Sequence, residues 1–220
     1  ADTLAPAPGM LVRVERVDGD GRRPRFMSGE SVGEALVNEQ GNYSLIGLPA
    51  DVYRARVLNN ATDFVGTPRR AAREVTLTPS TPQGSADFVV SLGGTIAGFV
   101  EGAERKPCSE ARLMLLPANL AELQMTGGED SPIDFMDLLS NRERNKTDES
   151  GQYEIRGVPL DFELSLKVSA EEFASPAPFR FKLTAEQRDI RRDFELQVGS
   201  SIAGSVHDGR RSPVIGAQAR

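Results

Sequence analysis

The sequence predicts an all-β protein built from tandem antiparallel β-sandwiches, and three observations lead to this fold class. The 220 residues include 21 glycines and 14 prolines, a content that suits many turns between short strands. Several segments alternate strictly between apolar and polar residues, which is the pattern of a strand with one buried face. Large parts of the chain recur 106 to 110 positions later, which indicates two copies of one structural unit.

Two pairs of segments carry this repeat. Residues 38–51, NEQGNYSLIGLPAD, and residues 148–161, DESGQYEIRGVPLD, are identical at six of fourteen positions. Residues 77–100 and 183–206 share nine residues: Leu-Thr, Asp-Phe, a glycine, and Ile-Ala-Gly with a valine two positions on. Each unit is therefore expected to run from an Ile-Ala-Gly strand to an Asp-Phe strand.

Prolines at matching places set the boundaries of the units. Pro107 stands four positions before Ala111. In the same way, Pro6 stands four positions before Met10, and Pro213 four positions before Ala217. We therefore expect the sequence to be part of a longer protein. The expected divisions are residues 1–93, a first sandwich lacking its first strand; residues 94–199, a complete second sandwich; and residues 200–220, the opening strands of a third.

Seven short strands are expected in the complete second copy, and the alternation of Phe194, Leu196 and Val198 is repeated by Phe88, Val90 and Leu92 in the first. Gly-Leu-Pro and Gly-Val-Pro turns connect strands, because glycine relieves the backbone and proline presets φ. Seven strands with turns between them indicate an antiparallel sandwich. The expected strands lie near 95–101, 110–116, 144–147, 153–157, 162–168, 180–184 and 191–198.

An insertion at residues 117–146 breaks the β alternation, and a short helical segment is expected there. Asn119 can cap one helix, and Ser131 with Pro132 next to it can start another. This insertion either covers one open end of the second sandwich or binds a partner, since function often sits on loops over a rigid scaffold. The candidate interaction surface consists of its apolar residues at helical spacing: Leu120, Leu123, Ile133, Met136 and Leu139.

The segment DESGQYEIRGVP, following Ile-Ala-Gly-x-Val and a proline turn, resembles the carboxypeptidase regulatory-like domain. The resemblance covers nearly the whole chain and implies a transthyretin-like, or prealbumin-like, seven-stranded β-sandwich. It also implies a non-catalytic role, in tandem arrays of bacterial secreted, periplasmic or cell-surface proteins or beside a metallocarboxypeptidase domain. The chain departs from the family at Asp51 and Asp161, where glycine is usual; aspartate can adopt the left-handed turn at some cost.

Composition excludes several classes of function. The net charge of −6, with 32 acidic and 26 basic residues, argues against nucleic acid as the main partner. No apolar stretch approaches the ~18 residues of a membrane helix. The single cysteine excludes an internal disulfide and a Cys-based zinc site, and the single histidine excludes a multi-histidine metal site. We expect no cofactor.

A few residues could still support chemistry. Asp18 and Asp20 lie in a Gly-rich segment, and Glu129, Asp130, Asp134 and Asp137 form an acidic group, so calcium is conceivable at either place. A hairpin turn and an acidic helix start are the favoured interpretations of the two. Cys108 is interpreted as a bystander thiol and His207 as a surface histidine.

The favoured function is a non-enzymatic tandem module of a larger secreted or surface protein, acting as spacer and protein-interaction scaffold. One alternative is a carbohydrate-binding module, although the chain has no tryptophan and three tyrosines, and sugar platforms usually rely on exposed aromatics. Another is an accessory domain that stabilises an adjacent metallocarboxypeptidase. Weak self-association is also expected, with residues 202–206 donated as a strand to another sheet edge.

Overall fold

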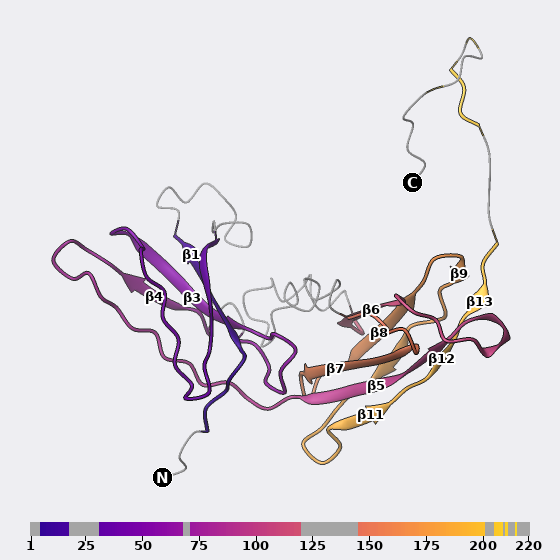
Figure 1. Cartoon of the computed structure of the whole chain (residues 1–220), viewed down its shortest axis with the longest axis horizontal. Helices are drawn as coiled ribbons and strands as arrows, with labels where there is room; N and C mark the ends of the chain where they lie inside the picture. The colour runs from indigo at the N-terminus through magenta and orange to yellow at the C-terminus, as the bar shows by residue number, and fades with distance from the viewer. Residues whose placement is uncertain are drawn as a thin grey trace.

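The computed structural model describes residues 5–17, 31–67, 71–119, 145–200, 205–208, 210 and 214. These residues form an all-β protein that also contains the 3-10 turn η2 (Ala103–Arg105). One sheet of the first part of the chain and a group of sheets of the second part lie end to end along the long axis of the molecule (Figure 1). We call residues 5–93 the N-terminal half and residues 94–199 the C-terminal half. In the described part of the chain we find no helix with the length and apolar character to cross a membrane.

The N-terminal half contains one antiparallel sheet of four strands. Its order is β2 (Ser31–Leu36), β1 (Leu11–Arg16), β3 (Val52–Leu58) and β4 (Arg73–Thr76). In β1 the alternate residues Val12 and Val14 are buried and their neighbours are partly exposed, as a strand with one core-facing side requires. The core forms on this face of β1 and β3.

The final segment of the N-terminal half differs from the expected strand. Phe88 and Val90 are partly buried and pack against the core, whereas Val89 between them is exposed. The expected alternation of buried and exposed side chains is therefore present. However, residues 82–91 are not a strand, and Leu92, expected on the buried face, is 50% exposed. The ladder is missing because the segment has no neighbouring strand along most of its length in the described residues.

The C-terminal half has two main sheets. The first is antiparallel, in the order β10 (Phe179–Phe181), β8 (Leu164–Ser169) and β6 (Arg112–Pro117). The expected strand at 144–147 is reduced to a single bridge between Lys146 and Arg112.

The second sheet is built around β5 (Gly94–Glu101), the Ile-Ala-Gly strand. It pairs antiparallel with β7 (Gln152–Val158) on one side. On the other side it pairs parallel with β11 (Asp189–Arg191) and β12 (Phe194–Glu195). The expectation of antiparallel pairing throughout was wrong here. After β7 the chain forms β8 and β10 in the first sheet, and it then returns to the second sheet on the other side of β5, parallel to it.

The expected single strand over 191–198 is divided into β11, β12 and β13 (Gln197–Val198), of which β13 pairs with β9 (Phe173–Ala174). β11 and β12 are separated at Arg192 and Asp193, and β12 and β13 are separated at Leu196. The Asp193 carboxylate accepts the backbone N–H of Phe99 at 2.9 Å, so a side chain replaces one ladder bond.

The core of the C-terminal half lies between its two sheets. One sheet contributes Ile96 and Val100, both fully buried, and the other contributes Leu113, Leu164 and Leu166. This core belongs entirely to residues between Ile96 and Leu196, and the N-terminal half has separate clusters of its own.

The repeat is visible in the turns of both halves. The Asn38 side-chain oxygen accepts the N–H groups of Gln40 and Asn42, and Asp148 accepts those of Ser150 and Gln152 in the same way. The hydrogen bond from the Ser150 hydroxyl, followed by those from the backbone N–H groups of Gln152 and Ser150, lowers the pKa of Asp148 below its ordinary value.

The two aspartates that depart from the family pattern behave differently. Asp161 adopts the left-handed conformation with φ +65°, as glycine would. Asp51 is not among the residues with positive φ, and its carboxylate instead forms an ion pair with Arg16, whose Nε lies 3.0 Å from Oδ2.

Candidate functional site

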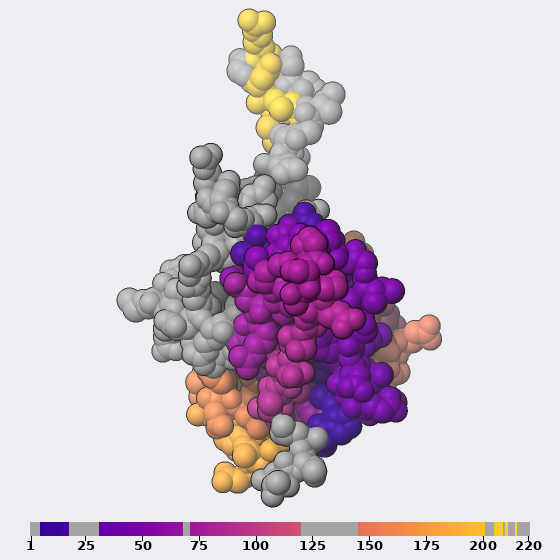
Figure 2. All heavy atoms as spheres, turned by 90° about the vertical axis from the view of Figure 1, so that its left-hand side faces the viewer, coloured from indigo at the N-terminus to yellow at the C-terminus, as the bar shows by residue number. Residues whose placement is uncertain are grey.

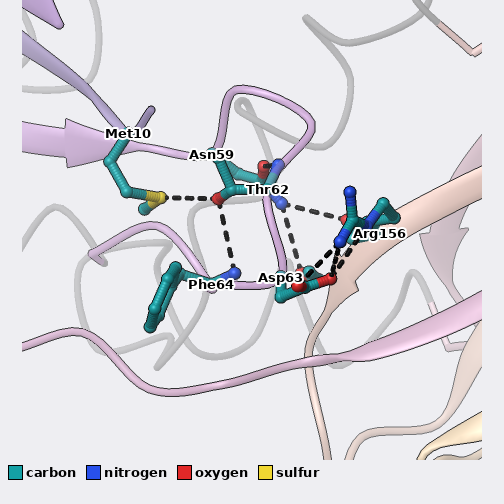
Figure 3. A network of polar contacts seen from close by, with 7 residues as sticks. Met10, Asn59, Thr62, Asp63, Phe64 and Arg156 are labelled. Carbon is teal, nitrogen blue, oxygen red and sulfur yellow. Dashed lines mark hydrogen bonds and ion pairs between the residues drawn. The ribbon is translucent and has the colours of Figure 1, made fainter. Parts of the chain in front are cut away.

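The candidate functional site is the joint between the two halves, shown in Figure 3. Its N-terminal side is the loop after β3, at residues 59–64, and its C-terminal side is the end of β7. Asp63 and Arg156 form the principal contact. The Arg156 guanidinium donates from Nε to Oδ1 of Asp63 at 2.8 Å and from Nη2 to Oδ2 at 2.7 Å. Such paired bonds fix direction as well as distance.

Asn59 adds a second contact across the joint. Its Nδ2 donates to the backbone oxygen of Arg156 at 3.0 Å, and its Oδ1 accepts the N–H of Thr62 at 3.1 Å. The amide is therefore held from both sides, and its orientation follows from these two bonds.

The loop itself is fastened to the N-terminal core. The Thr62 hydroxyl lies 2.9 Å from the Met10 sulfur, and Met10 is fully buried. Asn60 donates to the backbone oxygen of Gly9 at 3.1 Å. The joint residues are thus tied to the packed interior behind them, not only to one another (Figure 3).

Gly157 brings the two backbones into close approach. It has φ +65°, and a Cβ at this position would lie 2.1 Å from Asn59 Nδ2 and 2.5 Å from the Phe64 oxygen. Gly47 occupies the same repeat position with φ +78°, yet nothing lies within 4 Å of its equivalent Cβ. Both glycines allow the left-handed turn, but only Gly157 also makes room for a neighbouring unit.

The connecting chain is part of the joint. Gly93 donates its N–H to the backbone oxygen of Asp63 at 2.7 Å. A Cβ at Gly93 would lie 2.6 Å from the carbonyl carbon of Gly157. Gly94, the first residue of β5, is buried. The two halves are therefore joined through a bonded connection and not through a free linker.

The contacts of the joint contribute little to the free energy of unfolding, but they depend on direction. The Arg156 and Asp63 side chains are 43% and 51% exposed, and exposed pairs contribute about 0–1 kcal/mol. Hydrogen bonds such as that of Asn59 contribute about 0.5–1.5 kcal/mol each. The joint therefore fixes an orientation more than it raises the overall stability.

The described residues provide no catalytic arrangement around the cysteine or the histidine. Cys108 is buried, and burial raises the pKa of its thiol, which is the opposite of activation. The Nδ1 of His207 lies 3.4 Å from the Ser205 hydroxyl at an exposed position. No group of three or more His, Cys, Asp and Glu residues that could hold a metal occurs within the described ranges.

Several residues singled out in the sequence lie outside the described residues. They include the five members of the candidate interaction surface, both aspartates of the Gly-rich segment and the acidic group at 129–137. These residues are Leu120, Leu123, Ile133, Met136, Leu139, Asp18, Asp20, Glu129, Asp130, Asp134 and Asp137.

Sequence reasoning missed the joint residues Asn59, Asp63 and Arg156. One signal was present, because Arg156 stands directly before the Gly-Val-Pro turn while its repeat counterpart is Ile46. A charged residue in one copy and an apolar residue in the other indicates that the two copies have different neighbours at that place.

Similar proteins were found by structure only. No model of a protein family matches the sequence, and no curated protein matches it. The chain is similar to the minor pilin GBS52 of Streptococcus agalactiae, at 16% identity and a TM-score of 0.33 over 92% of this chain and 88% of the pilin. It is also similar to the shaft pilin SpaA of Lactobacillus rhamnosus GG, at 14% identity and a TM-score of 0.35 over 90% of each chain.

A partial similarity involves an enzyme. The 3-chlorocatechol 1,2-dioxygenase of Rhodococcus opacus matches 49% of this chain and 61% of its own, at 13% identity and a TM-score of 0.33. At these identities and TM-scores, a function for this chain has to be argued from its own contacts.

Proposed function

We propose that the chain is a non-enzymatic tandem β-sandwich module of a larger secreted or surface protein, where it acts as spacer and protein-interaction scaffold. In this proposal both halves are sandwiches of the carboxypeptidase regulatory-like type. Their boundaries fall at 93/94 and 199/200, the first of these inside the joint. The separate hydrophobic clusters of the two halves support this division.

The joint is the observation that carries the proposal. A spacer transmits its length only when its units keep one orientation. Asp63 and Arg156 fix direction, and Gly157 and Gly93 bring the backbones into contact. The end-to-end arrangement supports an extended role: Figure 2, seen from the N-terminal side, places that half in front of the orange C-terminal half.

The spacer role is tested by small-angle X-ray scattering of the full chain. We expect the scattering of the two described halves to be fitted by one fixed end-to-end arrangement at all concentrations at which the chain is monomeric. A curve that requires an ensemble of widely different angles between the halves would contradict a rigid spacer.

The interaction role is assigned to the insertion, whose two ends are anchored in the C-terminal half. Ala118 donates its N–H to the Glu163 oxygen at 2.9 Å before the insertion. After it, the Asn145 oxygen accepts the N–H of Leu113 at 2.8 Å and Thr147 donates to Ala111 at 3.0 Å. Since the strands hold both ends, residues 120–144 can be replaced by a short Gly/Ser turn without breaking these bonds.

This replacement tests the interaction role. If the insertion binds a protein partner, the shortened chain should lose capture of that partner while keeping the β-type circular dichroism of the full chain. Equal capture by both chains would contradict the assignment of the partner site to the insertion and leave a lid over the sandwich as its function.

Two alternatives from the sequence receive less support. A carbohydrate platform requires exposed aromatic faces. Yet each tyrosine donates its hydroxyl to a backbone oxygen of this chain: Tyr43 to Ala86, Tyr53 to Pro49 and Tyr153 to Arg192. An accessory role beside a metallocarboxypeptidase depends on neighbouring domains, and no contact in the described residues favours it.

A further inference from the structure

The C-terminal half presents two outer faces, one on each of its main sheets. Its core lies between the sheets, so each strand residue that alternates with core residues lies on one of these outer faces. The two faces are therefore on opposite sides of the half. Their exposed residues carry charges of opposite sign.

The outer face of the sheet of β10, β8 and β6 is basic. Lys167 in β8 and Arg180 in β10 are exposed, and each lies between residues that pack in the core. Arg112 at the start of β6 and Lys182 directly after β10 are exposed on the same face, and the exposed Glu163 directly before β8 is acidic. None of the four bases forms an ion pair with a described residue, so the face carries uncompensated positive charge.

The outer face of the sheet around β5 is acidic. Glu154 in β7 and Asp189 in β11 are exposed on either side of β5. Glu195 in β12 is the register partner of Glu101 in β5, so two carboxylates stand side by side. Like charges at facing positions of neighbouring strands destabilise a sheet. A positively charged occupant would relieve this repulsion.

The bases near this acidic face already have carboxylate partners. Arg191 lies 3.4 Å from Asp193, and Lys146 lies 3.2 Å from Glu110. Arg156 is part of the joint. Four acids of the face, by contrast, form no ion pair with a described residue: Glu101, Glu154, Asp189 and Glu195.

A hollow of about 990 Å³ lies on the acidic face. Its lining includes the short side chains of Thr95 and Ala97 in β5, and these two residues are flanked by Asp189 and Glu154, their respective register partners. A lysine or arginine side chain has a long apolar stem that can lie over such short side chains while its charged end reaches a carboxylate. The hollow therefore fits the side chains that the basic face presents.

We propose that the basic face of the C-terminal half binds the acidic face of the same half in a second copy of this chain. Lys167 and Arg180 enter the hollow over β5 and pair with Glu154 and Asp189. Because the two faces are different surfaces on opposite sides of one half, each copy keeps one face free, and copies join side by side in an open row. A second copy fits because one chain supplies both complementary charges.

This contact differs from the strand donation expected from the sequence, of which residues 202–204 lie outside the described residues. It also depends on salt in a defined way. At 0.1 M salt, charges more than about 10 Å apart are largely screened, so the net charge of −6 on each chain opposes the contact only weakly. At 1 M salt this distance falls to about 3 Å, and the attraction between the two faces is screened as well.

Charge reversal of one face at a time tests the proposal by sedimentation velocity over a hundredfold range of concentration in 0.1 M salt. The unmodified chain should shift to larger species, with a dissociation constant at least tenfold higher in 1 M salt. The variant Lys167→Glu, Arg180→Glu, Lys182→Glu has two acidic faces, and the variant Glu154→Lys, Asp189→Lys, Glu195→Lys has two basic faces. Each variant alone should remain a monomer, and an equimolar mixture of the two should associate.

The matched control changes three exposed acids outside both faces: Glu39→Lys, Glu74→Lys and Glu172→Lys. It should associate as the unmodified chain does, and circular dichroism should show that every variant is folded. A strictly monomeric unmodified chain, or a mixture of the two folded variants that stays monomeric, would overturn the contact between the faces. Undiminished association of both single-face variants would also overturn it and would leave strand donation as the contact between copies.

Discussion

Asp63 and Arg156, 93 positions apart in the sequence, form a two-bond ion pair that joins the loop after β3 to the end of β7. Asn59, Gly93 and Gly157 surround this pair with backbone contacts. Because each half has its own core, these contacts between described residues fix how the halves are oriented.

Removing the ion pair should change orientation more than stability. Arg156→Ala should lower the free energy of unfolding by about 1 kcal/mol or less, since both side chains are partly exposed. It should widen the range of angles between the halves, measured by NMR residual dipolar couplings. The matched control is Arg191→Ala, which breaks an exposed pair with Asp193 inside the C-terminal half and should leave the angles unchanged.

Gly157 and Gly47 allow the contribution of packing at the joint to be isolated. Alanine at either position costs about 1–2 kcal/mol for the left-handed backbone. Gly157→Ala should cost about 1–3 kcal/mol more, because its Cβ would meet the loop at Asn59 and Phe64. Urea unfolding of the two variants measures this difference. Equal losses would show that the halves do not press together at Gly157.

Alkaline pH should destabilise the C-terminal half through Tyr153. Burial, and then the Asp193 carboxylate, raise the pKa of Tyr153 above its ordinary value of 10.0. The folded state therefore holds the phenol proton more tightly than the unfolded state. This stabilisation is complete below pH 10 and falls as the pH rises above it.

The variant Tyr153→Phe tests this pH dependence. It should lose about 0.5–1.5 kcal/mol at pH 7, because the Arg192 oxygen loses its donor. Its unfolding free energy should then fall less steeply than that of the unmodified chain between pH 10 and pH 11, measured by thermal melting. Parallel curves for the two proteins would contradict the raised pKa.

The Cys108 thiol should report opening of the C-terminal half. It is buried, and burial raises its pKa, so both access and thiolate content are low. Its alkylation at pH 8 should be at least tenfold slower in the folded chain than in urea. Rapid alkylation without denaturant would show that this end of the half is open.

The all-β fold and the turns could be predicted because they follow from local signals. The glycine turns at Gly41 and Gly151 both adopt positive φ as the repeat indicates, and the apolar residues of β8 are buried in alternation with the exposed Lys167. These features depend on residues close together in the sequence, where periodicity and turn chemistry are informative.

The joint could not be predicted, since it depends on contacts between residues far apart in the sequence. Nothing near Asn59 or Asp63 distinguishes them from other polar loop residues until the fold places β7 beside them. The parallel pairing of β5 with β11 was missed for the same reason, because alternation defines a strand but not its neighbour.

The distance between the two halves tests the central claim most directly. Spin labels attached at Leu36→Cys in β2 and Lys167→Cys in β8, both exposed strand positions, in a Cys108→Ala chain allow this distance to be measured by pulsed electron paramagnetic resonance. A rigid joint predicts one narrow distance distribution that broadens when Arg156→Ala and Gly157→Ala are combined. A broad distribution in the chain with an intact joint would contradict the rigid spacer.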